Sequence, residues 1–86
     1  MTPRVLNRLI RAGEFFWVAD PLATQTGYSG QMERQALAAK SVQRGERKTV
    51  RVRTEIGWVE ATHVRRAGSQ SPIPLEHEGQ LTWAMN

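Results

Sequence analysis

The chain of 86 residues carries 12 Lys and Arg residues against 8 Asp and Glu residues, which gives a net charge of +4. This length fits one small domain, since single domains cluster near ~100–150 residues. The absence of cysteine excludes disulfide bonds and thiolate chemistry. No run approaches the ~18 apolar residues of a membrane-spanning helix, so we expect a cytoplasmic protein with no membrane partner.

The first residues predict a helix. Thr2 is a suitable N-cap, and Pro3 is favoured at the first helical position. Apolar and basic residues then fall on opposite sides of a helical spiral, with Val5, Leu6, Leu9 and Ile10 on one side and Arg4, Arg8 and Arg11 on the other. Gly13 is placed to end this amphipathic helix.

Residues 14–43 are predicted to form a strand and two helices. The run 14–19 is short, apolar and aromatic, as in a strand. Asp20-Pro21 repeats the N-cap and proline signal, which predicts a short helix to about residue 26. Residues 27–30 have the composition of a turn. Residues 31–43 are rich in good helix formers and predict a longer helix.

The most basic stretch runs from Lys40 to Arg53. It holds six basic residues and one acid, Glu46, a net charge of +5 against +4 for the whole chain. Apolar and basic residues alternate within Lys48–Thr54, which predicts a strand with one apolar and one cationic face. Trp58–Val64 predicts the returning strand of a hairpin. A row of outward-facing arginines indicates an anionic partner, and nucleic acid is the commonest one.

The composition shifts to Gly, Ser, Gln and Pro from Ala67 onward. Such residues favour turns and loops, so we expect a domain over residues 1–66 and a flexible tail over residues 67–86. The tail is acidic, with Glu76 and Glu78, and its apolar residues Leu81, Trp83 and Met85 are typical anchors for a protein partner.

Three short sequence features form a motif: an apolar pair (Leu22-Ala23), a glycine turn with a capping serine (Thr26-Gly27-Tyr28-Ser29), and an apolar residue in the next helix (Leu37). Together with the order of elements, this motif resembles the winged helix-turn-helix superfamily of DNA-binding proteins. The resemblance covers about residues 3–66. It implies an α+β fold of three helices followed by a C-terminal β-hairpin, the wing.

The resemblance also implies where nucleic acid would bind. The helix from Gln31 would be the recognition helix, and Gln31, Arg34 and Gln35 would reach base edges in the major groove of duplex DNA. The basic stretch would contact phosphates or the minor groove through Lys40, Arg44, Arg47, Lys48, Arg51 and Arg53.

A small SH3-like β-barrel is the alternative fold. Gly57-Trp58-Val59 followed by His63-Val64 resembles the end of such a barrel, where an aromatic residue after a glycine precedes the final strand. The order of elements favours the winged helix, because a long helix before the hairpin has no natural place in a small barrel. In either fold the aromatic side chains are expected mainly in the core, with base stacking as the alternative: Phe15, Phe16, Trp17, Tyr28 and Trp58.

The function expected from these patterns is that of a small basic DNA-binding protein, a transcriptional regulator or an accessory factor of a phage or other mobile element. The alternative is a protein-binding inhibitor or adaptor that acts through its apolar surface and its tail. No enzyme activity, cofactor or metal is expected, since no carboxylate pair or histidine pair in the sequence has metal-ligand spacing. A chain this short buries only roughly 60% of its unfolded surface, so a homodimer is left open.

Overall fold

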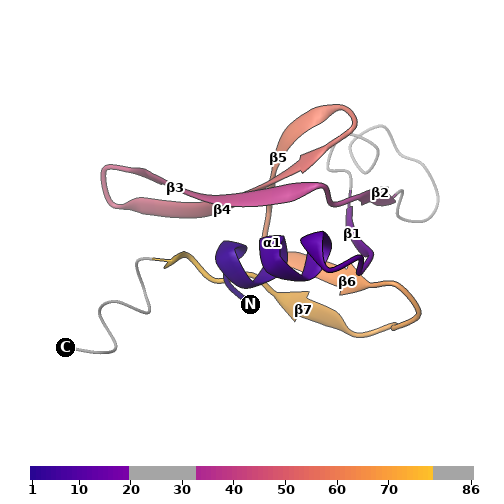
Figure 1. Ribbon diagram of the computed structural model, residues 1–86. Coiled ribbons are helices and arrows are strands. Elements are labelled where there is room, and N and C mark those ends of the chain that lie inside the picture. The colour runs from indigo at the N-terminus through magenta and orange to yellow at the C-terminus, as the bar shows by residue number, and fades with distance from the viewer. Residues whose placement is uncertain (20–32, 79–86) are drawn as a thin grey trace.

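The computed structural model describes residues 1–19 and 33–78. Within these residues the chain forms one helix followed by strands: α1 (Pro3–Arg11), β1 (Phe16–Ala19), β2 (Glu33–Gln35), β3 (Ala38–Arg44), β4 (Arg47–Thr54), β5 (Gly57–Ala61), β6 (His63–Arg66) and β7 (Pro72–Pro74) (Figure 1).

The strands form two antiparallel sheets. One sheet has four strands in the order β2-β1-β6-β7, and the other has three in the order β3-β4-β5. Trp17 in β1 lies opposite Gln35 on one side and Arg65 on the other, so β1 is a central strand of the four-stranded sheet. In the three-stranded sheet β4 is central, with β3 and β5 at the edges.

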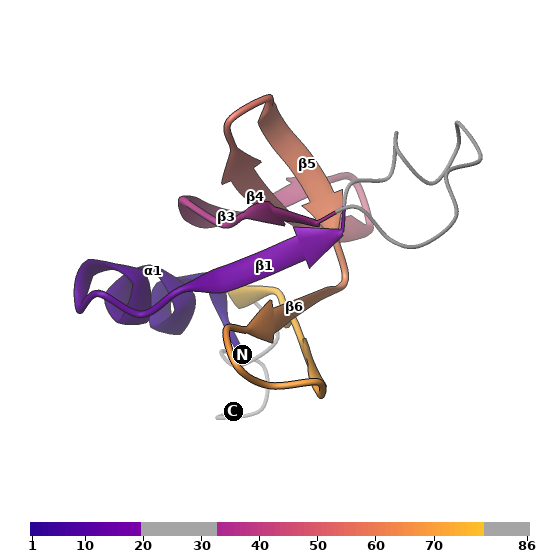
Figure 2. The same ribbon diagram turned by 90° about the vertical axis from the view of Figure 1, so that its right-hand side faces the viewer.

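Two stretches of chain pass directly from one sheet to the other. β2 runs into β3 through Ala36, whose amide donates to the Phe16 carbonyl at 2.9 Å, and Leu37, whose amide donates to the Arg53 carbonyl at 2.8 Å. β5 runs into β6 through Thr62. Figure 2 shows the three-stranded sheet above β1 and β6. The arrangement is compatible with a small β-barrel, the alternative fold considered from the sequence.

The core lies between the two sheets and α1. Its buried side chains come from every layer: Leu6, Phe16, Val18, Ala36, Ala39, Val52 and Val64. Phe16 and Val18 alternate with the half-buried Trp17 and Ala19, as expected for a strand with one face in the core. Val50 and Val52 are buried in the same way in β4, which confirms the apolar face predicted for that strand.

The helix α1 confirms the prediction for the N-terminus. The Thr2 hydroxyl accepts a hydrogen bond from the Val5 amide at 3.4 Å, and Pro3 begins the helix. Gly13 follows the C-cap with φ of +95°, a conformation that favours glycine. This helix is too short and too polar to cross a lipid bilayer.

The winged-helix prediction is wrong, because residues 33–44 form the strands β2 and β3 where the recognition helix was expected. The physical reason is tertiary pairing. Local helix propensity is a weak preference, and here the segment supplies backbone partners to β1 and to β4 while burying Ala36 and Ala39. The short helix expected over residues 20–26 and the motif at residues 22–29 lie outside the described residues.

The four-stranded sheet continues beyond residue 66, where the sequence predicted the end of the domain. Val64 in β6 pairs with Ile73 in β7. The Leu75 amide then donates to the Thr62 carbonyl at 2.8 Å, and the Met1 ammonium donates to the Pro74 carbonyl at 2.9 Å. Residues 67–78 therefore pack against the body of the protein, and the rest of the expected tail lies outside the described residues.

Candidate nucleic-acid interface

Two tight turns fix the register of β3, β4 and β5. Gly45 has φ of +60° between the paired residues Arg44 and Arg47, as the first central position of a type II′ turn requires. At the β4–β5 turn the Thr54 hydroxyl donates to the Gly57 carbonyl at 3.0 Å and accepts from the Ile56 amide at 3.2 Å. With such short loops, residues on the three strands are held opposite one another.

One face of the three-stranded sheet points away from the core and carries most of the basic stretch. In β4 the residues that alternate with buried Val50 and Val52 lie on this face, and their cross-strand partners in β3 and β5 share it. We call this surface the cationic face. Its members are Ala38, Lys40, Val42, Arg44, Arg47, Thr49, Arg51, Arg53, Trp58 and Glu60.

Like charges lie directly opposite one another on the cationic face. Lys40 faces Arg51, and Arg44 faces Arg47. Such pairs destabilise a sheet. Glu60 is the one acid that the described residues contribute to this face, and its carboxylate lies 3.1 Å from Nη2 of Arg47. Five basic residues against one acid give the face a net charge of +4.

Arg51 occupies the middle of the cationic face, between Lys40 and Glu60 in register. Its Nε atom is buried and has no hydrogen-bond partner in the described part of the chain. A shallow hollow of about 80 Å³ opens beside it, lined by Val42, Arg44, Arg47, Thr49, Arg51 and Glu60. Guanidinium groups match the geometry of phosphate oxygens, so a hollow with three of them suits a phosphate group.

Trp58 is the aromatic residue of the cationic face. It lies opposite Arg53 on the neighbouring strand, and its side chain is 39% exposed. The Nζ atom of Lys40 lies over the indole ring, 4.3 Å from its centroid. This is a cation–π contact, and it holds the lysine over the ring rather than out in solvent.

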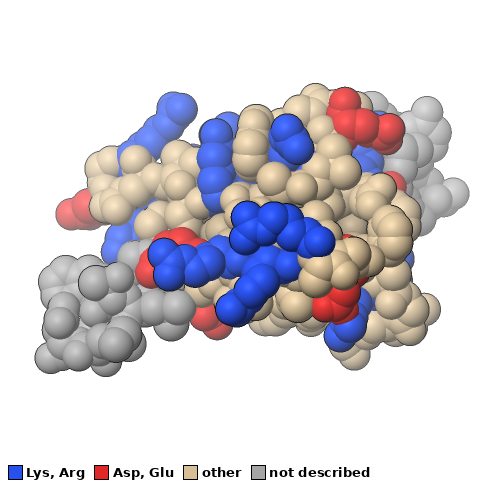
Figure 3. Space-filling model, viewed as in Figure 1, with Lys and Arg blue, Asp and Glu red and all other residues tan. Residues whose placement is uncertain are grey.

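A second set of basic residues lies on α1. Arg4, Arg8 and Arg11 are exposed on the side of the helix opposite the buried Leu6. Figure 3 shows Lys and Arg side chains gathered over α1 and over the β3–β4 hairpin. The helix therefore offers positive charge without an exposed aromatic ring, which makes it a useful comparison for the cationic face.

The structure brings five of the predicted site residues together on the cationic face: Lys40, Arg44, Arg47, Arg51 and Arg53. Lys48 lies opposite Gln43 and projects on the other side of the sheet, where it is exposed. Lys40 and Arg44 reach the face from a strand, whereas the sequence placed them on or just after a helix.

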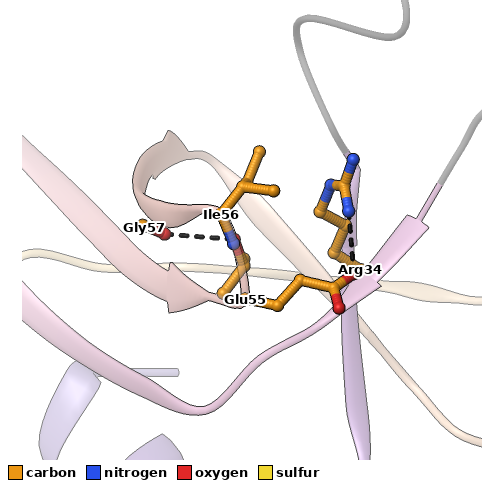
Figure 4. A network of polar contacts seen from close by, with 5 residues as sticks. Arg34, Glu55, Ile56 and Gly57 are labelled. Atoms are coloured by element: carbon orange, nitrogen blue, oxygen red, sulfur yellow. Dashed lines mark hydrogen bonds and ion pairs between the residues drawn. The ribbon is translucent and has the colours of Figure 1, made fainter.

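Arg34 and Gln35 are in strand β2, not in a recognition helix, which corrects the role expected for them. Arg34 donates to the Glu55 carboxylate at 2.7 Å, beside the β4–β5 turn (Figure 4). Gln35 lies opposite Trp17 in the other sheet. The third residue of this group, Gln31, lies outside the described residues, as do Leu81, Trp83 and Met85.

Trp58 and Glu60 were not among the site residues predicted from the sequence. Aromatic residues were expected mainly in the core, and Phe16 is indeed buried there. The available signal was the alternation in β5, where Trp58 and Glu60 fall on one side and Val59 and Ala61 on the other. Once Val59 and Ala61 pack against the core, Trp58 must face outward with the arginines.

The outer side of the four-stranded sheet holds a different polar cluster. Arg65 forms a paired contact with Glu33, with Nε at 2.9 Å and Nη2 at 2.8 Å from the two carboxylate oxygens. This hydrogen bonding holds the pKa of the Glu33 carboxyl below its ordinary value. Because the two charges neutralise each other, the cluster offers less to an anion than the cationic face. Among the described residues no group of His, Asp and Glu is arranged to hold a metal ion.

Comparisons with known proteins identify no relative of this chain. The chain matches no protein-family model, and no curated protein or solved structure is significantly similar to it. A fold of this kind hosts many unrelated functions, so the function is inferred from the site alone.

Proposed function

We propose that this chain is a small nucleic-acid-binding protein and that the cationic face is its contact surface. The observation that carries the proposal is the register of the three-stranded sheet, which places Lys40 against Arg51 and Arg44 against Arg47 on an exposed surface. Like charges in these positions cost stability. A polyanion lying across the face neutralises them and releases counterions, which favours binding.

The composition of the face favours nucleic acid over other polyanions. The guanidinium groups around the Arg51 hollow match phosphate oxygens. Trp58 adds an aromatic surface beside Arg53. Nucleic acid has both phosphates and bases that stack on aromatic rings, whereas a sulfated polysaccharide or an acidic peptide segment has no bases to place there.

The test is the salt dependence of binding. The wild-type protein is titrated with a labelled oligonucleotide at several salt concentrations, beside the double variant Arg51→Ala with Arg53→Ala. Each phosphate contact releases roughly 0.7–0.9 counterion, so the loss of two contacts should lower the slope of log K against log salt by roughly 1.4–1.8. The fold should survive, because Val50 and Val52 on the opposite side of β4 carry the packing.

Arg8→Ala with Arg11→Ala is the matched control, because it removes the same charge from α1. This control should change the slope much less. An equal loss in both double variants would show that net charge, not the cationic face, governs binding. A wild-type affinity that does not vary with salt would overturn the proposed function.

A further inference from the structure

Trp58 lies among cations on an exposed sheet, and this arrangement bears on which form of nucleic acid the face can bind. Its cross-strand partner is Arg53, and Lys40 covers the ring at 4.3 Å from the centroid. Among the described residues three other large apolar side chains are exposed, Phe15, Leu37 and Ile56, and none of them belongs to the cationic face. Trp58 is therefore the one aromatic ring that a ligand on this face would meet.

The shape of the cationic face does not suit the grooves of duplex DNA. Neighbouring strands lie about 4.8 Å apart, so three strands span roughly 10 Å before any side chain is added. The major groove is about 12 Å wide and admits a helix or a two-stranded ribbon. Long basic side chains add to this width, so a three-stranded face meets the phosphates of a duplex more readily than its base edges. The expectation of duplex DNA came from a recognition helix, which the structure replaces with strands.

Single-stranded nucleic acid can contact both the Trp58 ring and the basic residues of the cationic face. Its bases are unpaired and can stack on an aromatic ring, while its phosphates lie along the neighbouring basic residues. At an exposed site a cation–π contact is weaker than the stacking of a base on the same ring. A base can therefore displace the Lys40 ammonium from Trp58, and the released ammonium is then free to contact a phosphate.

We infer that the cationic face binds single-stranded nucleic acid in preference to duplex, with one base stacked on Trp58 in the place of Lys40. The inference rests on the proposed function, because it assumes that the cationic face is the contact surface. The ligand class is a single strand of either DNA or RNA, since both have stacking bases and a phosphate backbone. In the complex, Arg51 and the neighbouring arginines hold the phosphates on either side of the stacked base.

The experiment measures fluorescence anisotropy with three labelled probes: oligothymidylate of about 15 nucleotides, oligouridylate of the same length, and a duplex of the same length. The proteins are wild type, Trp58→Ala, Trp58→Phe and the control Phe15→Ala, which removes an exposed aromatic residue away from the face. Circular dichroism and thermal melting confirm that each variant is folded.

The wild type should bind oligothymidylate and oligouridylate more tightly than duplex. Trp58→Ala should weaken single-strand binding by roughly 5- to 100-fold and leave duplex binding nearly unchanged. Trp58→Phe should retain most of the affinity, because phenylalanine also stacks, and Phe15→Ala should bind as the wild type does.

Failure of this inference differs from failure of the proposed function. If Trp58→Ala binds single strands as the wild type does, or weakens single-strand and duplex binding equally, the stacking site is overturned. Tighter binding of duplex than of single strands by the wild type would also overturn the inference. In these cases the proposed function still stands if Arg51→Ala with Arg53→Ala lowers the salt slope. If the wild type binds none of the probes, the proposed function itself fails.

Discussion

Among the described residues, Glu60 is the one acid on the cationic face. Its negative charge repels the phosphates of the proposed ligand. It lies opposite Arg51 in register, and both of its oxygens are 3.1 Å from Nη2 of Arg47. The carboxylate therefore occupies a guanidinium that a phosphate would otherwise contact. Because both side chains are largely exposed, the ion pair contributes only about 0.2–1 kcal/mol to stability. A phosphate can displace it at small cost.

Glu60→Gln should therefore strengthen nucleic-acid binding. The substitution removes a like charge from the path of the phosphates and frees Arg47, so the affinity should rise by roughly 2- to 10-fold at low salt. The slope of log K against log salt should steepen by roughly 0.7–0.9, because one more phosphate contact is made. Binding isotherms at several salt concentrations measure both quantities.

Glu55→Gln is the matched control for this prediction. Glu55 is also exposed and also paired with an arginine, Arg34, but it lies at the β4–β5 turn and not on the cationic face. The two variants have the same net charge. If Glu55→Gln raised the affinity as much as Glu60→Gln, the effect would come from net charge and the role assigned to Glu60 would be wrong.

Among the elements, α1 protects the exposed edge of the three-stranded sheet. The Asn7 side chain accepts from the Ala39 amide at 2.8 Å and donates to the Ala39 carbonyl at 2.9 Å. It thus supplies the two hydrogen bonds that a neighbouring strand would make with β3. This pairing holds the helix against β3 and satisfies backbone groups at an edge that would otherwise be open to another chain.

Asn7→Ala should destabilise the protein by about 1–3 kcal/mol, because both backbone groups of Ala39 lose their partner. Urea unfolding followed by circular dichroism gives the free energy of unfolding. The control is Arg8→Ala, the next residue on the exposed side of the helix, which should change that free energy by less than about 0.5 kcal/mol. Equal small effects of the two substitutions would contradict the edge-protection role.

The elements that the sequence predicted correctly are those with local signals. The N-cap, proline and apolar periodicity of α1 all act within one or two turns. The alternation in β4 likewise shows within a few residues, and its pairing with β5 confirms a hairpin. The expected returning strand Trp58–Val64 is correct only as far as Ala61, because His63 and Val64 belong to β6 in the other sheet. These signals do not depend on the rest of the chain.

The β2–β3 segment was mispredicted because its conformation is set by distant partners. Alanines and charged residues favour a helix locally. In the fold, Ala39 instead faces Val52 and the Asn7 side chain, contacts that residues 36–44 do not themselves specify. The composition of the site could not be predicted fully for the same reason, because it also depends on which strands pair. The arginines of β4 could be assigned to an outward face, but Lys40 and Trp58 joined them only once β3 and β5 were placed on either side.

At the scale of the whole molecule, the fold places the cationic face on one sheet and a pair of opposite charges on the other. The outer side of the three-stranded sheet has a net charge of +4, while the other sheet pairs Arg65 with Glu33. The interface proposed here is therefore confined to one side of the molecule. A ligand bound there contacts β3, β4 and β5 and leaves the four-stranded sheet untouched.

The most direct test is a nuclear magnetic resonance titration of the ¹⁵N-labelled protein with oligothymidylate of about 10 nucleotides. The account predicts that the largest shift changes fall on Lys40, Arg51 and the Trp58 indole N–H, with little change at Trp17 or in α1. Changes centred on Trp17 and Arg65, or on the arginines of α1, with the cationic face unaffected, would contradict it.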